Sequence, residues 1–152
     1  GHMGVEWNLL KQPQEDIDKL HEWVSEFKKH REWFAVDTVV HSDAADPAVR
    51  VDGCVMPNKD AAIYRFTQLT TSQTYPAAPV RLPGLDPDAV YEVSPLEVSL
   101  DLAKQDIGNG QSPLGWWTAE GVRMTGRALA SYGIRPPALH PAQAVLFKVV
   151  RV

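Results

Sequence analysis

Two adjacent tryptophans are the residues of this sequence whose type and position best suit ligand binding. Trp116 and Trp117 lie in a loop that contains proline and glycine, just before a stretch of alternating polar and apolar residues. Indole rings beside a loop can stack on the apolar face of a sugar ring. Adjacent side chains of an extended chain, however, point to opposite faces. We therefore expect packing as their main role, with one indole in the core and the other at an edge, and we keep sugar contact as the alternative.

The histidines form no pattern that predicts catalysis or metal binding. His21 and His30 are nine residues apart in a predicted helix, whereas helical pairs that bind a metal favour a spacing of four. His41 and His140 fall near the ends of predicted strands and turns. We interpret all four as surface histidines or as histidines with satisfied hydrogen bonds.

The aspartates of the first turn region are interpreted as a solvated edge. They alternate with polar neighbours and lack an Asp-x-Asp-x-Asp-Gly calcium loop; they are Asp37, Asp43, Asp46 and Asp52. The sequence also lacks a Gly-x-Ser-x-Gly elbow and a phosphate-binding loop. We therefore predict no catalytic residue, no metal and no cofactor. Cys54 is the single cysteine, so it forms no disulfide within the chain and is expected to be a small buried hydrophobe.

Composition predicts one ordinary globular domain. The chain has 152 residues, of which 44% are hydrophobic and 22% charged. The densest basic cluster, residues 28–31, ends a predicted helix, and the formal net charge is −4, so a nucleic-acid partner is not expected. Neither a membrane-spanning apolar run nor a signal peptide is visible. We accordingly expect no membrane partner and a cytoplasmic location.

One amphipathic helix is predicted over residues 14–34. Pro13 suits the first helical turn, and Glu15 and Asp16 follow at the positive end of the helix dipole. Apolar residues then recur at helical spacing and form one stripe, which we expect to be an interface: Ile17, Leu20, Val24, Phe27 and Phe34.

Beyond the helix the pattern changes to period two, which predicts strands. Turn residues separate the predicted strands, which are Thr38–His41, Val49–Met56, Ala61–Thr70, Pro79–Leu82, Val90–Val93, Val122–Ala128 and Ala144–Val150. Residues 98–120 are expected to be a long irregular connection. The predicted fold is mainly β, an antiparallel β-sandwich preceded by one long amphipathic α-helix. We divide the chain into residues 1–3, which look like a cloning remnant, 4–35 with the helix, and 36–152 with the sandwich; the abrupt start suggests a piece of a longer protein.

Four stretches, taken in order, resemble the C-terminal region of family 36 glycoside hydrolases, the α-galactosidases. GVEWNLL (4–10) is similar to the Gly-x-Glu-Trp-Asp-Leu stretch before the last helix of that family's catalytic barrel, and FKKHREWF (27–34) lies where that helix ends. VRLPGLDPDAVYEV (80–93) resembles the family's Leu-x-Gly-Leu-Asp-Pro…Tyr-x-Val hairpin. GWWTAEGVRMTGRALASYGI (115–134) resembles its Trp, then Ser/Thr-Gly-x-x-Leu, then Gly-Leu/Ile ending.

The resemblance implies an accessory domain rather than an active site. The two catalytic aspartates of this retaining family lie in the barrel, upstream of all residues here. Lys104-Gln105-Asp106 has the form of the family's Lys-x-Asp nucleophile motif but falls in the irregular connection, so we interpret it as a coincidence. Asn8 stands where the family often has an aspartate. The implied function is a non-catalytic C-terminal domain that braces the barrel of an α-galactosidase.

The implied partner is therefore the missing barrel, toward which one of the two tryptophans could face. When the barrel is absent, we expect the helix stripe to fold back on the sandwich or, preferably, to pair with a second copy in a homodimer. An independent carbohydrate-binding module is the alternative function, and Tyr64 and Phe66 are its only aromatic pair spaced two apart on a strand; we expect that pair to be core. A generic sandwich adaptor would follow only if the family resemblance failed.

Overall fold

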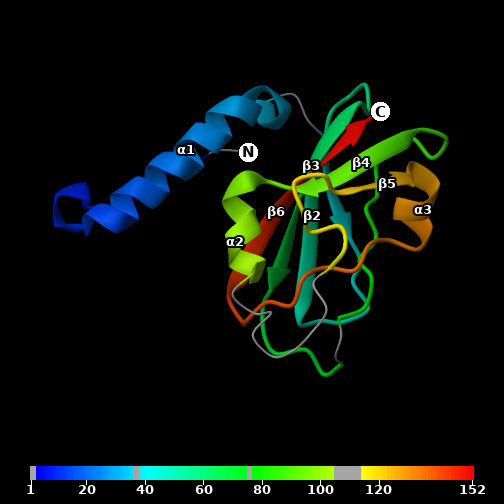
Figure 1. Ribbon diagram of the computed structural model, residues 1–152. Helices are drawn as coiled ribbons and strands as arrows, with labels where there is room; N and C mark the ends of the chain where they lie inside the picture. The colour runs from blue at the N-terminus through cyan, green and yellow to red at the C-terminus, as the bar shows by residue number, and fades with distance from the viewer. Residues whose placement is uncertain (1–2, 36–37, 75–76, 105–113) are drawn as a thin grey trace.

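The computed structural model describes residues 3–35, 38–74, 77–104 and 114–152. In these residues six strands form one antiparallel sheet in the order β1-β2-β3-β6-β4-β5. The strands are β1 Thr38–Ser42, β2 Val49–Val55, β3 Ala61–Gln68, β4 Val90–Pro95, β5 Val122–Thr125 and β6 Gln143–Arg151. The predicted fold class, mainly β and antiparallel with one long helix, is confirmed (Figure 1).

Alternation along the strands builds the core on one face of the sheet, which we call the inner face. In β3 the side chains of Ala62, Tyr64 and Phe66 are fully buried, and the register places Tyr64 opposite Phe147 of β6. The rings of Tyr64 and Phe147 stack with centroids 5.9 Å apart. The expectation that Tyr64 and Phe66 form a core pair is confirmed. Aromatic pairs across neighbouring strands are a main source of sheet stability.

Loops and one short helix, α3 (Gly126–Ser131), cover the inner face (Figure 1). The predicted strand Pro79–Leu82 is reduced to a single bridge between Val80 and Ile134 within this covering layer. The predicted strand Val122–Ala128 is too long, because β5 ends at Thr125 and α3 begins at Gly126. Gly126 and Ala128 continued the apolar alternation in the sequence, but the Thr125 side chain accepts a hydrogen bond from the backbone N–H of Ala128 and starts a helix.

A long helix, α1, lies on the opposite, outer face of the sheet. A second helix, α2, follows β4, contacts β6 and meets the inner core through Leu100. α1 spans Gln14–Ala35, which confirms the predicted helix, and it contacts α2 and strands β2 and β3. α2 spans Glu97–Lys104, where the sequence predicted an irregular connection. It was missed because it is only eight residues long. Figure 1 shows the N-terminal half of α1 extending away from the sheet. Within the described residues, no helix has both the length and the apolar character needed to cross a membrane.

Candidate functional site

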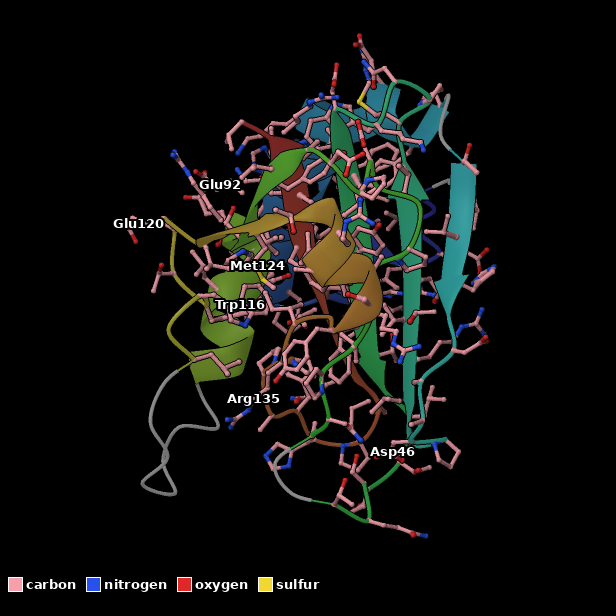
Figure 2. All side chains as sticks on the ribbon, turned by 90° about the vertical axis from the view of Figure 1, so that its right-hand side faces the viewer. Asp46, Glu92, Trp116, Glu120, Met124 and Arg135 are labelled. Atoms are coloured by element: carbon pink, nitrogen blue, oxygen red, sulfur yellow. The ribbon has the colours of Figure 1, made fainter. Side chains whose placement is uncertain are left out.

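The tryptophan pair lies in the core that covers the inner face. Trp116 and Trp117 are 7% and 8% exposed, and their rings meet edge to face with centroids 5.0 Å apart. Trp116 also packs edge to face on Phe147, at 5.6 Å. Its indole N–H donates to the backbone carbonyl of Arg135 over 2.9 Å; both residues are labelled in Figure 2.

The expectation that the two indoles point to opposite faces is wrong. The chain here is a turn rather than an extended strand, since the backbone N–H of Trp117 donates to the carbonyl of Leu114 over 3.0 Å. The turn directs both side chains into the same core. Buried to this degree, neither ring presents an open face on which a sugar could stack.

The family-like stretches 80–93 and 115–134 meet at one structural junction around Asp86 and Gly126. A Cβ on Gly126 would lie 2.0 Å from the Asp86 carbonyl oxygen, so any larger residue would displace this backbone. The N–H of Gly126 donates to the Ala89 carbonyl, and the N–H of Arg127 donates to the Pro87 carbonyl. The Leu-Asp-Pro turn and the Thr-Gly-x-x-Leu stretch are thus two halves of one packing unit.

Tyr91 and Gly133 complete this junction. The Tyr91 hydroxyl donates to the Lys59 carbonyl over 2.8 Å and accepts from the Asp86 N–H over 3.0 Å. Gly133 follows α3 with a φ of +87°, a left-handed conformation that favours glycine, and a Cβ there would lie 2.2 Å from the Val80 carbonyl oxygen. The geometry assigns these residues to packing and hydrogen bonding.

The most connected charged group of the described residues is Asp52, on the outer face of β2. Its carboxylate accepts from Arg65 over 2.7 Å and from Arg50 over 2.9 Å, and it lies 2.7 Å from the His41 ring nitrogen Nδ1. Burial acts to raise the pKa of Asp52, but hydrogen bonds from Arg65, Arg50 and His41 outweigh it and lower the pKa to about 2. The interpretation of Asp52 as part of a solvated edge is therefore wrong, because its side chain is 13% exposed and neutralised by neighbours.

The other aspartates and histidines are dispersed. Asp43 is exposed, Asp46 accepts a hydrogen bond from the Ala48 N–H, and Asp37 lies outside the described residues. His21 and His140 are exposed. His30 packs against Trp33, and its Nε2 lies 3.0 Å from Glu26 Oε1.

The described residues contain no metal cluster, and they do not include the whole Lys-x-Asp motif. Among the described residues, no three His, Cys, Asp or Glu side chains gather as metal ligands would. Gln105 and Asp106 lie outside the described residues. Cys54 is half-buried on the outer face of β2, rather than fully buried as expected.

The helix stripe is divided between two environments. All five of its residues are half-buried. Phe27 and Phe34 stack at 5.5 Å and, with Trp23, line an apolar cavity of about 190 Å³ against Leu96 and Leu146. That cavity holds none of the stripe's first three members, which are Ile17, Leu20 and Val24.

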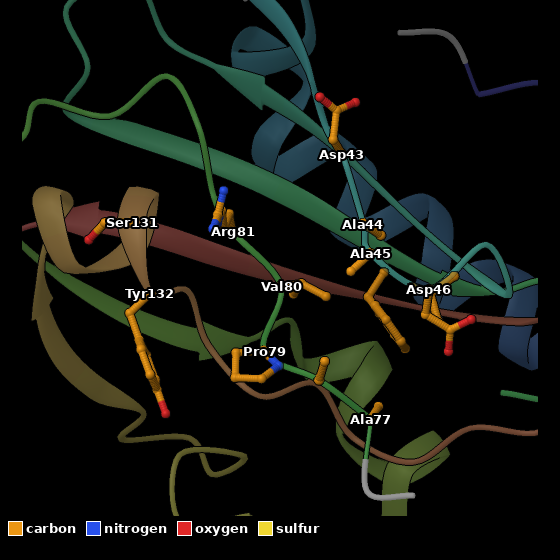
Figure 3. Close-up of a pocket in the computed structure, with 13 residues that line it drawn as sticks. Asp43, Ala44, Ala45, Asp46, Ala77, Pro79, Val80, Arg81, Ser131 and Tyr132 are labelled. Carbon is orange, nitrogen blue, oxygen red and sulfur yellow. The ribbon is translucent and has the colours of Figure 1, made fainter. Parts of the chain in front are cut away.

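A second cleft, which sequence patterns did not reveal, lies on the inner-face side of the sheet. It has a volume of about 490 Å³, and among the described residues its charged and aromatic lining consists of Asp43, Asp46, Arg81, Phe66 and Tyr132 (Figure 3). These residues come from four separate segments, so no local motif could have indicated them. Unlike the tryptophan pair and the Asp52 cluster, this cleft combines open space with exposed charged and aromatic groups.

Comparisons with known proteins identify relatives of this chain. Residues 49–149 match the model of the glycosyl hydrolase family 36 C-terminal domain. The chain is 24% identical over 151 residues to an Escherichia coli α-galactosidase, covering 99% of this chain and 21% of that protein. It therefore spans about a fifth of that relative's length.

Solved structures show the same fold. The α-galactosidase of Lactobacillus brevis superimposes with a TM-score of 0.71 at 17% identity, covering 97% of this chain and 18% of that one. The galactosidase domain of the α-galactosidase–sucrose kinase AgaSK gives 0.69 at 20% identity, covering 95% and 17%. The α-galactosidase AgaA of Geobacillus stearothermophilus gives 0.70 at 15% identity, covering 97% and 17%.

Proposed function

This chain belongs to the glycosyl hydrolase family 36 C-terminal domains, and on that basis we propose that it is the non-catalytic accessory domain of an α-galactosidase, bracing the catalytic barrel of its parent chain. The observation that carries the proposal is the uncovered apolar surface at its N-terminal end. Trp7 is 54% exposed, Leu9 48% and Leu10 98%. Apolar side chains gathered at this density on a surface mark a contact with another protein region.

The helix stripe extends this surface. Ile17 and Leu20 lie in the half of α1 that projects beyond the sheet (Figure 1). The C-terminal half of the same helix packs on the outer face of the sheet. In this proposal, the C-terminal half of α1 is fixed to this domain and its N-terminal half contacts the barrel. The Escherichia coli relative aligns over 99% of this chain, helix included, within a much longer protein, which supports a barrel upstream.

A non-catalytic role for the chain itself follows from the chemistry of retaining hydrolysis. That reaction needs two carboxyl groups about 5–5.5 Å apart, one as nucleophile and one as acid/base. Asp52, which has the most ionic partners of any aspartate that the structure describes, is engaged by two arginines and a histidine. The chemistry of an α-galactosidase parent would then reside in its upstream part.

The alternatives have less support. The aromatic residues that the sequence suggested for an independent carbohydrate-binding module, Tyr64, Phe66, Trp116 and Trp117, are all buried. A generic adaptor was expected only if the family resemblance failed, and the family match removes that condition.

Substitution of Leu20 in the full-length parent tests the bracing role. Leu20→Glu places a charge in the proposed helix–barrel contact and should destabilise the parent by about 2–3 kcal/mol, with a lower melting temperature and lower turnover of an aryl α-galactoside. His21→Glu, at a neighbouring exposed position, adds the same carboxylate and should change stability by less than about 0.5 kcal/mol. If Leu20→Glu leaves both the melting temperature and the turnover of the parent unchanged, the bracing proposal is wrong.

For the chain on its own, we propose a homodimer through Ile17 and Leu20, the half-buried part of the stripe that lies outside the apolar cavity. Ile17 and Leu20 of two antiparallel helices would cover one another where the barrel is absent. Sedimentation equilibrium should detect the dimer at high concentration, and Leu20→Glu should convert it to monomer while His21→Glu should not. A monomer at all concentrations would contradict this part of the proposal.

A further inference from the structure

We infer that the cleft between the turn after β1, residues 77–81 and the end of α3 is a weak binding site for neutral saccharides. Figure 3 shows the segment carrying Pro79, Val80 and Arg81 between the turn with Asp46 and the end of α3 with Tyr132. The volume of about 490 Å³ falls in the range of small-ligand sites, which is about 300–1,000 Å³. It is large enough for one or two sugar rings.

The floor of the cleft is apolar and its rim is polar. Pro79, Val80 and Val49 line it together with several alanines. Sugar rings have apolar C–H faces and hydroxyl edges, so a mixed lining suits them. Tyr132 is 73% exposed and lies at the cleft, which leaves its ring free to stack on such a C–H face.

The charged groups at the rim favour a neutral ligand. Arg81 and Asp43 are exposed, and neither forms an ion pair with any residue that the structure describes. One guanidinium supplies several N–H donors and two carboxylates supply acceptors, which together match the hydroxyl groups of a sugar. Asp43 and Asp46 would repel an anion, while Arg81 and the apolar floor disfavour a small cation.

The cleft lies on the inner-face side of the sheet, whereas α1 packs on the outer face. The inference does not depend on the proposed bracing role. It also differs from the module alternative, since it uses none of the buried tryptophans and does not require the chain to act alone. With one stacking ring and a few solvent-exposed hydrogen bonds, we expect dissociation constants on the order of 1–10 mM.

Titration of the chain with raffinose, followed by amide chemical shifts, tests the site. Saturable shifts should be confined to residues 43–49, 77–81 and 131–134. Tyr132→Ala and Arg81→Gln should each weaken binding by at least about fivefold, whereas Tyr132→Phe, which retains the ring, should bind within about twofold of the original chain. Maltotriose in a parallel titration distinguishes a site that prefers galactosyl groups from one that accepts neutral saccharides in general, and either result fits the inference.

Two control variants test whether the loss of binding is specific to residues of the cleft. Arg31→Gln removes an exposed arginine from α1, and Trp7→Ala removes an exposed aromatic ring that does not line the cleft; neither should alter the titration. The backbone N–H of Tyr132, not its side chain, caps α3, so Tyr132→Ala should stay folded, which its amide spectrum would verify. The inference is overturned if shifts do not saturate below about 50 mM, if they lie outside the cleft, or if Tyr132→Ala and Arg81→Gln bind as well as the controls.

Discussion

Replacing Asp52 by asparagine tests the charge cluster on the outer face of the sheet. The substitution keeps the size of the side chain but removes the negative charge that Arg50, Arg65 and His41 share. The side chain of Asp52 is only 13% exposed, so asparagine would leave two guanidinium groups facing each other without a counter-charge. We therefore expect Asp52→Asn to destabilise the chain at neutral pH.

The pKa sets the size of the effect and its dependence on pH. The folded-state pKa of about 2 lies below the ordinary value of 3.8, despite burial, because of hydrogen bonds from Arg65, Arg50 and His41. The difference corresponds to an upper limit of about 2.4 kcal/mol. The partner side chains are 51% to 62% exposed, and solvent screening reduces the expected contribution to about 1–1.5 kcal/mol. Because the folded-state pKa is depressed, this stability is present above pH 3.8 and is lost as the pH falls toward 2.

Urea unfolding followed by tryptophan fluorescence measures this directly, since Trp116 and Trp117 move from the core to water. The free energy of unfolding of Asp52→Asn should lie about 1–1.5 kcal/mol below that of the original chain at pH 7, and the gap should shrink to a few tenths at pH 2. Asp43→Asn changes the net charge equally at an exposed position and should show a gap below about 0.5 kcal/mol at both values. A gap for Asp52→Asn that does not change between pH 7 and pH 2 would refute the reasoning.

Three further predictions concern the junction, the core and the chemistry. Gly126→Ala should destabilise the chain by at least about 2 kcal/mol in urea unfolding, because its Cβ would lie 2.0 Å from a backbone oxygen. The control Gly115→Ala, with no atom within 4 Å of its Cβ, should cost less than about 0.5 kcal/mol. Equal effects of the two substitutions would contradict the close packing of Gly126 at the junction. Trp116→Ala should cost about 3–5 kcal/mol by the same measurement, and a loss below about 1 kcal/mol would contradict its place in the core. The purified chain should not hydrolyse an aryl α-galactoside, and turnover that Asp106→Asn abolishes would contradict this.

Elements with a strong local period could be predicted from the sequence. The helical stripe gave α1 to within one residue at each end, and alternation gave the starts of β2 and β3. Elements for which the sequence carries two conflicting patterns could not be predicted. Residues 122–128 alternate as a strand does, yet Thr125 followed by Gly-Arg-Ala-Leu also has the form of a capped helix start. The structure follows the cap, and Leu129 is fully buried on the resulting helix α3.

Features formed by contacts between residues far apart in the chain could not be predicted without the register of the sheet. Asp52 lies directly opposite His41 in β1 and Arg65 in β3, and those pairs are 11 and 13 residues apart in the chain. Without the register of the sheet, the sequence shows only four separate charged residues, so the carboxylate of Asp52 was interpreted as solvated. The cleft at Arg81 and Tyr132 has the same origin, since its walls come from segments that no local pattern connects.

The helix stripe shows where a periodic pattern stops being informative. Periodicity determines which side of α1 is apolar. It does not indicate what covers that side, because every residue of the stripe follows the same periodic pattern. In the structure the cover changes along the helix: Phe27 and Phe34 meet Leu96 and Leu146 of the same chain, while Ile17 and Leu20 lie in the half that leaves the sheet. Fixing the C-terminal half sets the direction of the whole helix, because α1 is continuous over 22 residues. The sheet therefore determines where the N-terminal half of α1 points, and with it the surface that the proposed barrel or second copy would contact.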